Sequence, residues 1–130
     1  IPVVNVADVE ASSKGGGSEV SMEQILQWNP DYLLVDGAAL AEEIKKDPAW
    51  GALEAVKNDK IIIIPSVPYG FMGYPPSINR YLGVRWLGAT FYPQIYIDSP
   101  EKQVKDFFKL FYSIEVDDAQ LAEILAGTFE

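Results

Sequence analysis

The sequence predicts an α/β fold: a Rossmann-like, three-layer lobe with a mostly parallel central sheet, flanking helices and a helical pair at the carboxyl end. Two short predicted strands, at residues 32–35 and 60–64, are continuously apolar apart from Lys60 at the start of the second, as strands covered on both faces of a parallel sheet are. A helix-forming stretch separates them, and a strand–helix–strand order is the usual way to place two parallel strands side by side.

The segment before the first of these strands contains a helix start signal. Ser21 is followed by Gln24 three residues later, which is the spacing of a capping box, and this predicts a helix over residues 22–28. Further upstream, residues 1–7 are apolar and β-branched and are predicted as a strand or its end. Residues 11–18 are rich in Ser and Gly and are predicted as a flexible loop.

Several further helices are expected from residue preferences and apolar periodicity. Pro48 suits the first turn of a helix that runs to about Lys57. An apolar stripe near the carboxyl end has the i, i+3, i+4, i+7 spacing of a helix that packs one face on a core: Val104, Phe107, Phe108 and Phe111. The predicted helices cover residues 38–46, 48–57, 76–92, 99–113 and 117–126.

Composition narrows the class of function. The 130 residues suffice for one domain, and the net charge of −9 disfavours binding to nucleic acid or directly to an anionic membrane surface. No apolar stretch reaches the roughly 18 residues that a membrane-spanning helix needs. A basic protein partner remains compatible with this charge.

The chain contains neither Cys nor His. This excludes Ser-His-Asp and Cys-His catalysis, thiolate metal sites and His-containing zinc sites. The acidic pairs Glu42–Glu43 and Asp117–Asp118 are interpreted as solvated charges, because adjacent residues on a helix point apart. An enzyme could still use carboxylates, Lys or Tyr, but the lack of Cys and His disfavours catalysis, and we predict no catalytic residue, no metal ligand and no cofactor.

A candidate ligand site follows the second strand. Residues 65–76 hold four Pro, two Gly and several aromatic side chains, so they form neither a regular helix nor a central strand. Ligands of parallel sheets sit beyond the carboxyl ends of the strands, where this loop begins. The predicted ligand-binding residues of the loop are Tyr69, Phe71, Met72 and Tyr74. The alternative is that these side chains only cap the edge of the sheet.

Arg80 is the charged candidate at the same site. It lies near the start of the helix that follows the loop, where a guanidinium could pair with a catecholate or carboxylate. Arg85, one turn farther along, is a weaker candidate. A surface ion pair is the alternative role for Arg80.

Four segments together resemble one protein family. Val20–Val35 is similar to the "S-x-E-Q-(I/L)-L…N-P-D" segment of periplasmic binding proteins for iron siderophores, haem and cobalamin, and Trp50–Pro65 is similar to their "W-x-x-L-x-A-V-K" element. Pro75–Leu87 resembles their "P-x-x-(N/L)-R-x-x-G-x-x-W-L" helix, and Phe107–Tyr112 their closing aromatic helix. The four segments occur in the family's order and cover nearly the whole chain.

The resemblance implies that residues 1–130 are the carboxy-terminal lobe of a two-lobed protein, with the amino-terminal lobe and connecting helix absent. Such proteins capture an iron-siderophore-type chelate between their lobes, outside the cytoplasmic membrane, and deliver it to the permease of an ABC importer. Many are periplasmic or are anchored as lipoproteins. A Glu on each lobe of the relatives docks on the permease, and Glu23 matches that position here. The relatives' loop and helix Arg correspond to Tyr69–Tyr74 and Arg80.

Three alternatives remain open. The chain could be an enzyme-like α/β domain that uses Tyr and carboxylates, or an interaction module whose aromatic loop binds a protein. It could also serve transport with a bare ferric ion or an oxyanion as ligand, because Tyr oxygens suit the former and Arg80 with backbone amides suits the latter.

Overall fold

The computed structural model describes residues 20–73 and 77–126. The strand predicted at residues 1–7, the loop predicted at 11–18 and Tyr74 lie outside the described residues. The chain divides into two compact units. The first unit comprises residues 1–33 and 43–61, and the second comprises residues 34–42 and 62–130.

The first unit begins, within the described residues, with α1 (Met22–Trp28), as the sequence predicts. The Ser21 hydroxyl accepts a hydrogen bond of 3.2 Å from the backbone N–H of Gln24, which confirms the predicted cap. The helix ends at Asn29, which has the left-handed φ of 40° and donates its N–H to the carbonyl of Ile25. The Asn29 side chain also accepts from the backbone N–H of Glu54, so it joins the end of α1 to a later helix.

The single helix predicted from Pro48 to Lys57 is wrong. The structure has a 3-10 helix, η2 (Trp50–Ala52), and a short helix, α3 (Glu54–Lys57). Leu53 separates them with an extended backbone (φ −74°, ψ 139°) and is completely buried. The break lets Leu53 enter the core of this unit, and its burial outweighs the preference for a continuous helix.

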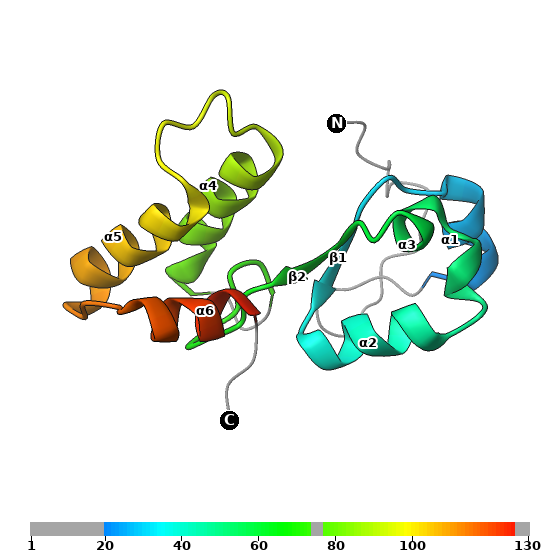
Figure 1. Ribbon diagram of the computed structural model, residues 1–130, viewed down its shortest axis with the longest axis horizontal. Coiled ribbons are helices and arrows are strands. Elements are labelled where there is room, and N and C mark those ends of the chain that lie inside the picture. Colours follow the sequence, from blue (N-terminus) through cyan, green and yellow to red (C-terminus); the bar gives the residue numbers. More distant parts are fainter. Residues whose placement is uncertain (1–19, 74–76, 127–130) are drawn as a thin grey trace. The chain divides into compact units, whose positions relative to one another are not determined.

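The sheet consists of β1 (Leu33–Asp36) and β2 (Ile61–Ile64), which are parallel neighbours, with α2 (Ala38–Lys46) between them in the chain (Figure 1). This confirms the predicted α/β class and the strand–helix–strand order. The expected complete burial of the strands is wrong, since Leu34 is 37% exposed and the four Ile of β2 are only partly buried. Each strand has one neighbour in the described sheet, so its other edge is not covered by a strand there.

The second unit contains three longer helices: α4 (Asn79–Phe91), α5 (Pro100–Tyr112) and α6 (Asp118–Ala126). Figure 1 shows α5 lying beside both α4 and α6, in agreement with the contacts between them. The apolar stripe of α5 is buried as predicted except for Phe111, which is 51% exposed. The buried core consists of Phe71, Leu82, Trp86, Val104, Phe107, Phe108, Val116, Leu121 and Ile124.

None of the helices in residues 20–73 and 77–126 is both long and apolar enough to cross a membrane.

Candidate functional site

The segment that leaves β2, residues 65–73, is here named the rim loop. It closes on itself, because the backbone N–H of Phe71 donates a hydrogen bond of 2.9 Å to the carbonyl of Pro65. Both of these residues are buried. The peptide bond between Val67 and Pro68 is cis. The buried Pro65 and Phe71 mark an inner side of the loop, which packs on the core, and the exposed residues mark an outer side.

The predicted ligand residues divide between these two sides. Tyr69 is 50% exposed and Met72 is 39% exposed, so both present surface that a ligand could contact. Phe71 is completely buried and packs edge-on against Trp86, with the ring centroids 6.2 Å apart. The expectation that Phe71 offers aromatic surface at the rim is therefore wrong, because its ring gains more from burial against Trp86 than from exposure.

Arg80 lies in the first turn of α4 and is bonded to the rim loop. Its Nη2 donates a hydrogen bond of 3.1 Å to the carbonyl of Gly73, and its side chain is exposed. The interaction that the structure gives for Arg80 is thus with backbone rather than with a carboxylate. A guanidinium carries five N–H donors, so this bond leaves donors available for an anion. The structure therefore brings Arg80, Tyr69 and Met72 to one loop and the helix start beside it.

Two residues that the sequence analysis did not single out complete this site. Asn79, the first residue of α4, is completely buried. Its Nδ2 donates to the carbonyl of Tyr69 at 2.8 Å, and its Oδ1 accepts from the Tyr112 hydroxyl at 2.7 Å. Tyr112 is the last residue of α5, 33 positions later in the chain.

One local signal could have pointed to this arrangement. Gly83 lies four residues after Asn79 inside an otherwise regular helix, and a Gly in a helix interior often marks a close approach of backbone. A Cβ at position 83 would overlap the carbonyl of Phe71, so only Gly lets the rim loop lie against α4 here.

Burial also affects the Tyr112 phenol. Desolvation raises the pKa of Tyr112 above its ordinary value, and the nearby Tyr69 acts in the same direction. The phenol is neutral at physiological pH even at its ordinary pKa of about 10, and it is a hydrogen-bond donor to Asn79.

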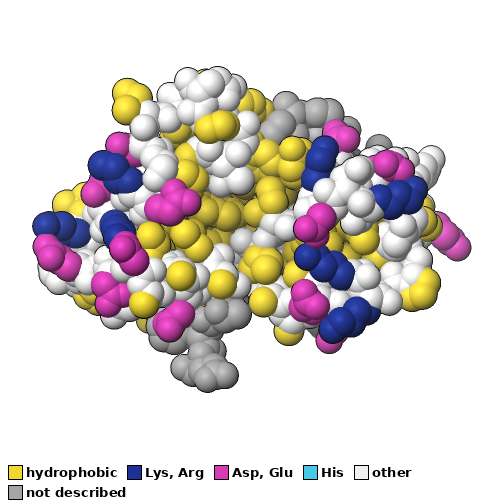
Figure 2. Space-filling view, viewed as in Figure 1, with side chains coloured by type: hydrophobic (Ala, Val, Ile, Leu, Met, Phe, Trp, Pro, Cys, Tyr) yellow, Lys and Arg dark blue, Asp and Glu magenta, His cyan; other side chains and the backbone are white. Residues whose placement is uncertain are grey.

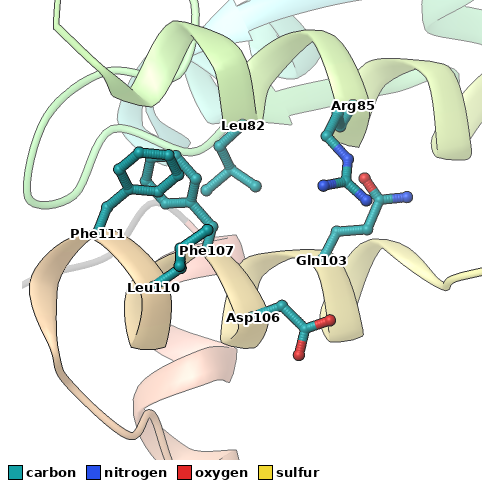
Figure 3. A pocket seen from close by; sticks show the side chains of 7 residues that line it. All are labelled: Leu82, Arg85, Gln103, Asp106, Phe107, Leu110 and Phe111. Atoms are coloured by element: carbon teal, nitrogen blue, oxygen red, sulfur yellow. The ribbon is translucent and has the colours of Figure 1, made fainter.

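The described residues of the second unit also line further hollows. One, of about 200 Å³, is almost wholly apolar and lies where the rim loop meets α5 and α6, with Val67, Phe108 and Ile124 in its lining. Another, of about 60 Å³, lies between α4 and α5. Figure 3 shows Arg85 and Gln103 pointing toward one another across this smaller cavity. The structure thus associates Arg85 with this cavity, whereas Arg80 is bonded to the rim loop.

Gln103 leaves an acceptor without a partner in the smaller cavity. The side chain is buried, and its Nε2 donates to the carbonyl of Asp98 at 3.0 Å, but its Oε1 has no hydrogen-bond partner among the described residues. The cavity, of about 60 Å³, has room for water. A water that donates to Oε1 would satisfy this acceptor, so the cavity needs no other occupant.

Glu23 is exposed in the first turn of α1, in the first unit, whereas the rim loop belongs to the second. An acidic side chain in the first turn also suits the helix macrodipole. Figure 2 shows acidic and basic side chains interspersed on the face in view, so the net charge of −9 is not gathered there into one acidic patch.

Comparison with known proteins decides the family. A family model described as "Periplasmic binding protein" matches residues 2–68, which is just over half of the chain. The chain belongs to this family. The match includes the Ser21 cap, Glu23 and both strands, and it ends within the rim loop. It confirms the resemblance that the sequence motifs indicated.

Individual periplasmic binding proteins are similar over more of the chain. The molybdate-binding protein MolA of Haemophilus influenzae is 32% identical over 108 residues, which are 81% of this chain and 30% of MolA. A structure of an ABC transporter solute binding protein from Sulfurospirillum deleyianum has a TM-score of 0.75 and 32% identity, over 84% of this chain and 34% of that one. The structure of MolA bound to molybdate has a TM-score of 0.62 and 29% identity, over 82% and 34%. The chain thus spans about a third of the length of these relatives.

Proposed function

We propose that this chain is the carboxy-terminal lobe of the solute-binding protein of an ABC importer. In this role it contributes one side of a cleft between two lobes, outside the cytoplasmic membrane and, by the resemblance, with a lipid anchor as one option. The observation that carries the proposal is the rim loop. It leaves the end of β2, presents Tyr69 and Met72, and is bonded through Gly73 to Arg80.

An oxyanion such as molybdate is the first candidate ligand. Arg80 supports it, because an exposed guanidinium with donors to spare can bind an oxyanion through charge-assisted hydrogen bonds. Two further observations favour this class. MolA, to which the chain is 32% identical, is a molybdate-binding protein. The burial of Phe71 also leaves less aromatic surface at the rim than a large organic chelate would use.

An iron-siderophore-type chelate is the second candidate. The exposed Tyr69 and Met72 favour it, since an aromatic ring and a thioether offer apolar contact to a flat organic ligand. A bare ferric ion has less support. Among the described residues no three acidic side chains gather where they could hold a metal ion, and Tyr69 is the one described rim residue with a phenol oxygen.

Calorimetric titration of the full-length protein separates these ligands. The panel contains molybdate, tungstate, sulfate, ferric catecholate, ferric hydroxamate, haem and cobalamin. We expect micromolar or tighter binding of molybdate and discrimination against sulfate. Binding of a ferric chelate with no response to molybdate would favour the second candidate, and no binding by any compound would contradict the proposed role.

Arg80 and Arg85 provide a matched pair for the same titration. Arg80→Gln should weaken the binding of an oxyanion at least about tenfold, because a charge-assisted hydrogen bond is lost. Arg85→Gln, five residues along the same helix, should leave the affinity unchanged, since this side chain lies at the α4–α5 cavity. Equal losses in both variants would argue against Arg80 as a ligand residue.

The permease is the proposed protein partner, with Glu23 as the docking residue on this lobe. The support is the resemblance together with the exposure of the Glu23 side chain at the start of α1. The acidic charge of the chain suits a partner with basic pockets, because complementary charge guides association.

A further inference from the structure

The rim loop is held on α4 through its backbone. The carbonyl of Tyr69 accepts from Asn79, and the carbonyl of Gly73 accepts from Arg80. Between them, the carbonyl of Phe71 lies so close to Gly83 that no Cβ fits there. Three alternate carbonyls of the loop thus meet the first turns of one helix, and the conformation that exposes Tyr69 and Met72 depends on these contacts.

The contact at Asn79 is oriented by Tyr112. A carbonyl can only accept, so the side-chain amide of Asn79 must turn its Nδ2 toward the carbonyl of Tyr69. Its Oδ1 then faces Tyr112, and the phenol, which can either donate or accept, is required to donate. The orientation of the amide therefore follows from the partners themselves.

The middle residue of this relay, Asn79, is shielded from bulk water, whereas Tyr112 is partly buried. Asn79 is completely buried, and both of its side-chain bonds are short, at 2.8 and 2.7 Å. Tyr112 packs by its ring against Phe107 and Phe108 of its own helix, which fixes where its hydroxyl lies. The phenol is neutral at physiological pH and can donate, since the ordinary pKa of Tyr is already about 10 and desolvation raises the pKa of Tyr112 further.

We propose that Tyr112 is a positioning residue of the ligand site, which acts through Asn79 to hold the Tyr69–Met72 part of the rim loop in its binding conformation. This rests on the proposed role of the rim loop in ligand binding. Tyr112 itself touches no ligand in this scheme. Its hydroxyl orients the Asn79 amide, and the amide holds the backbone at Tyr69. The position of that backbone determines that the Tyr69 and Met72 side chains are exposed.

The methionines allow a test that needs no ligand. The 130 residues contain two, Met22 in α1 and Met72 in the rim loop, and the Met72 side chain lies beside Gly83. Methyl-labelled methionine in the full-length protein reports on both by NMR, with each signal assigned by its loss in a Met→Leu variant. Tyr112→Phe removes the hydroxyl and keeps the ring. Tyr81→Phe is the matched control, because Tyr81 is 73% exposed on α4.

We expect Tyr112→Phe to shift or broaden the Met72 signal and to leave the Met22 signal in place. Tyr81→Phe should change neither. An unchanged Met72 signal in folded Tyr112→Phe would overturn the proposal. So would an equal shift of both methionines, since that would report a general loss of structure rather than a displaced loop.

A ligand titration forms the second arm, with molybdate as the probe or ferric catecholate if the wild type binds that compound instead. Tyr112→Phe should weaken binding about tenfold through the displaced loop, and Tyr81→Phe should not. Unchanged affinity in Tyr112→Phe would overturn the positioning role in binding. If the wild type binds no probe, the proposed function fails, while the Met72 signal still decides whether Tyr112 holds the loop.

Discussion

The hydroxyl of Tyr112 donates a hydrogen bond of 2.7 Å to Oδ1 of Asn79, and so joins the last residue of α5 to the first residue of α4. Asn79 continues the connection to the carbonyl of Tyr69. A helix end far along the chain is thereby linked to the loop that carries the candidate ligand residues. A buried polar side chain with its partners in place favours one arrangement of the backbone, and Asn79 at the centre of this link is completely buried with both its Nδ2 and its Oδ1 hydrogen-bonded.

Stability measurements on this pair should show coupling. Tyr112→Phe should lower the free energy of unfolding by about 1 kcal/mol, the typical net worth of one hydrogen bond. Asn79→Ala should cost about 2–3 kcal/mol, because it leaves the partners of a buried amide unsatisfied. The double variant should cost about 1 kcal/mol less than the sum of the two, since both changes remove the same bond. Urea unfolding measures all four proteins, and additive losses would contradict the coupling.

High pH should lower the free energy of unfolding through ionisation of the Tyr112 phenol. Its pKa is raised in the folded state, so the stabilisation is fully present below the unfolded value of about 10 and is lost as the pH rises through the folded value. Lys102 and Lys109 have pKa values raised mainly by hydrogen bonds to Asp106 and Glu115, and they lose their ion pairs in a similar pH range.

A comparison of wild type with Tyr112→Phe isolates the phenol, because both proteins retain these lysines. The wild type should be the more stable protein from pH 7 to about pH 9.5, and its advantage should shrink above about pH 10. Thermal unfolding over this pH series is the measurement. A difference that stays constant up to pH 12 would count against the raised pKa.

Gly83→Ala tests the close approach of the rim loop to α4. The new methyl group would overlap the carbonyl of Phe71, so backbone must move, and we expect a loss of at least about 2 kcal/mol of stability. Gly51→Ala is the matched control, since a Cβ there meets no atom within 4 Å. It should be neutral or stabilise by up to about 1 kcal/mol. Similar effects of the two substitutions in urea unfolding would show that the loop yields easily at Gly83.

Substitution of Phe71 should mainly lower stability, whereas substitution of the neighbouring Met72 should mainly lower ligand affinity. Phe71→Ala removes a completely buried ring from its contact with Trp86 and should cost about 3–5 kcal/mol of stability. Met72→Ala removes a partly exposed side chain and should cost under about 1 kcal/mol. Its main effect should be on ligand affinity, measured by titration with the compound that the wild type binds. A small loss of stability in Phe71→Ala would indicate that this ring can leave the core.

The proposed docking role of Glu23 can be tested by comparison with an acidic residue at the start of a second helix. Glu23 and Glu101 are both acidic residues in the first turn of a helix, so replacing either with Ala removes a similar helix-dipole interaction. Glu23→Ala should reduce cellular uptake of the bound compound at least several-fold and leave its affinity unchanged. Glu101→Ala should affect neither. Loss of affinity in Glu23→Ala would argue against a role confined to docking.

Local chemistry made much of this fold predictable. The Ser21 cap and the helix after it, α2, and the order of strand, helix and strand all follow from signals within a few residues of each element. The irregular loop after β2 was also predictable, because its Pro and Gly residues prevent regular structure. The interruption of the predicted helix at Leu53 shows the limit of such signals, because the burial of that side chain accounts for it and no local signal does.

By itself the sequence determined the family, the strand–helix–strand order and the position along the chain of the irregular loop that carries the candidate ligand residues. Only the tertiary structure decided which side of that loop faces outward, with Phe71 buried and Tyr69 exposed. It also decided the pairing of Asn79 with Tyr112, which are 33 residues apart. Local preferences depend on neighbours in the chain and can be read from the sequence. The direction of a loop side chain depends on the free energy of packing against distant residues, and that exists only once the helices have come together.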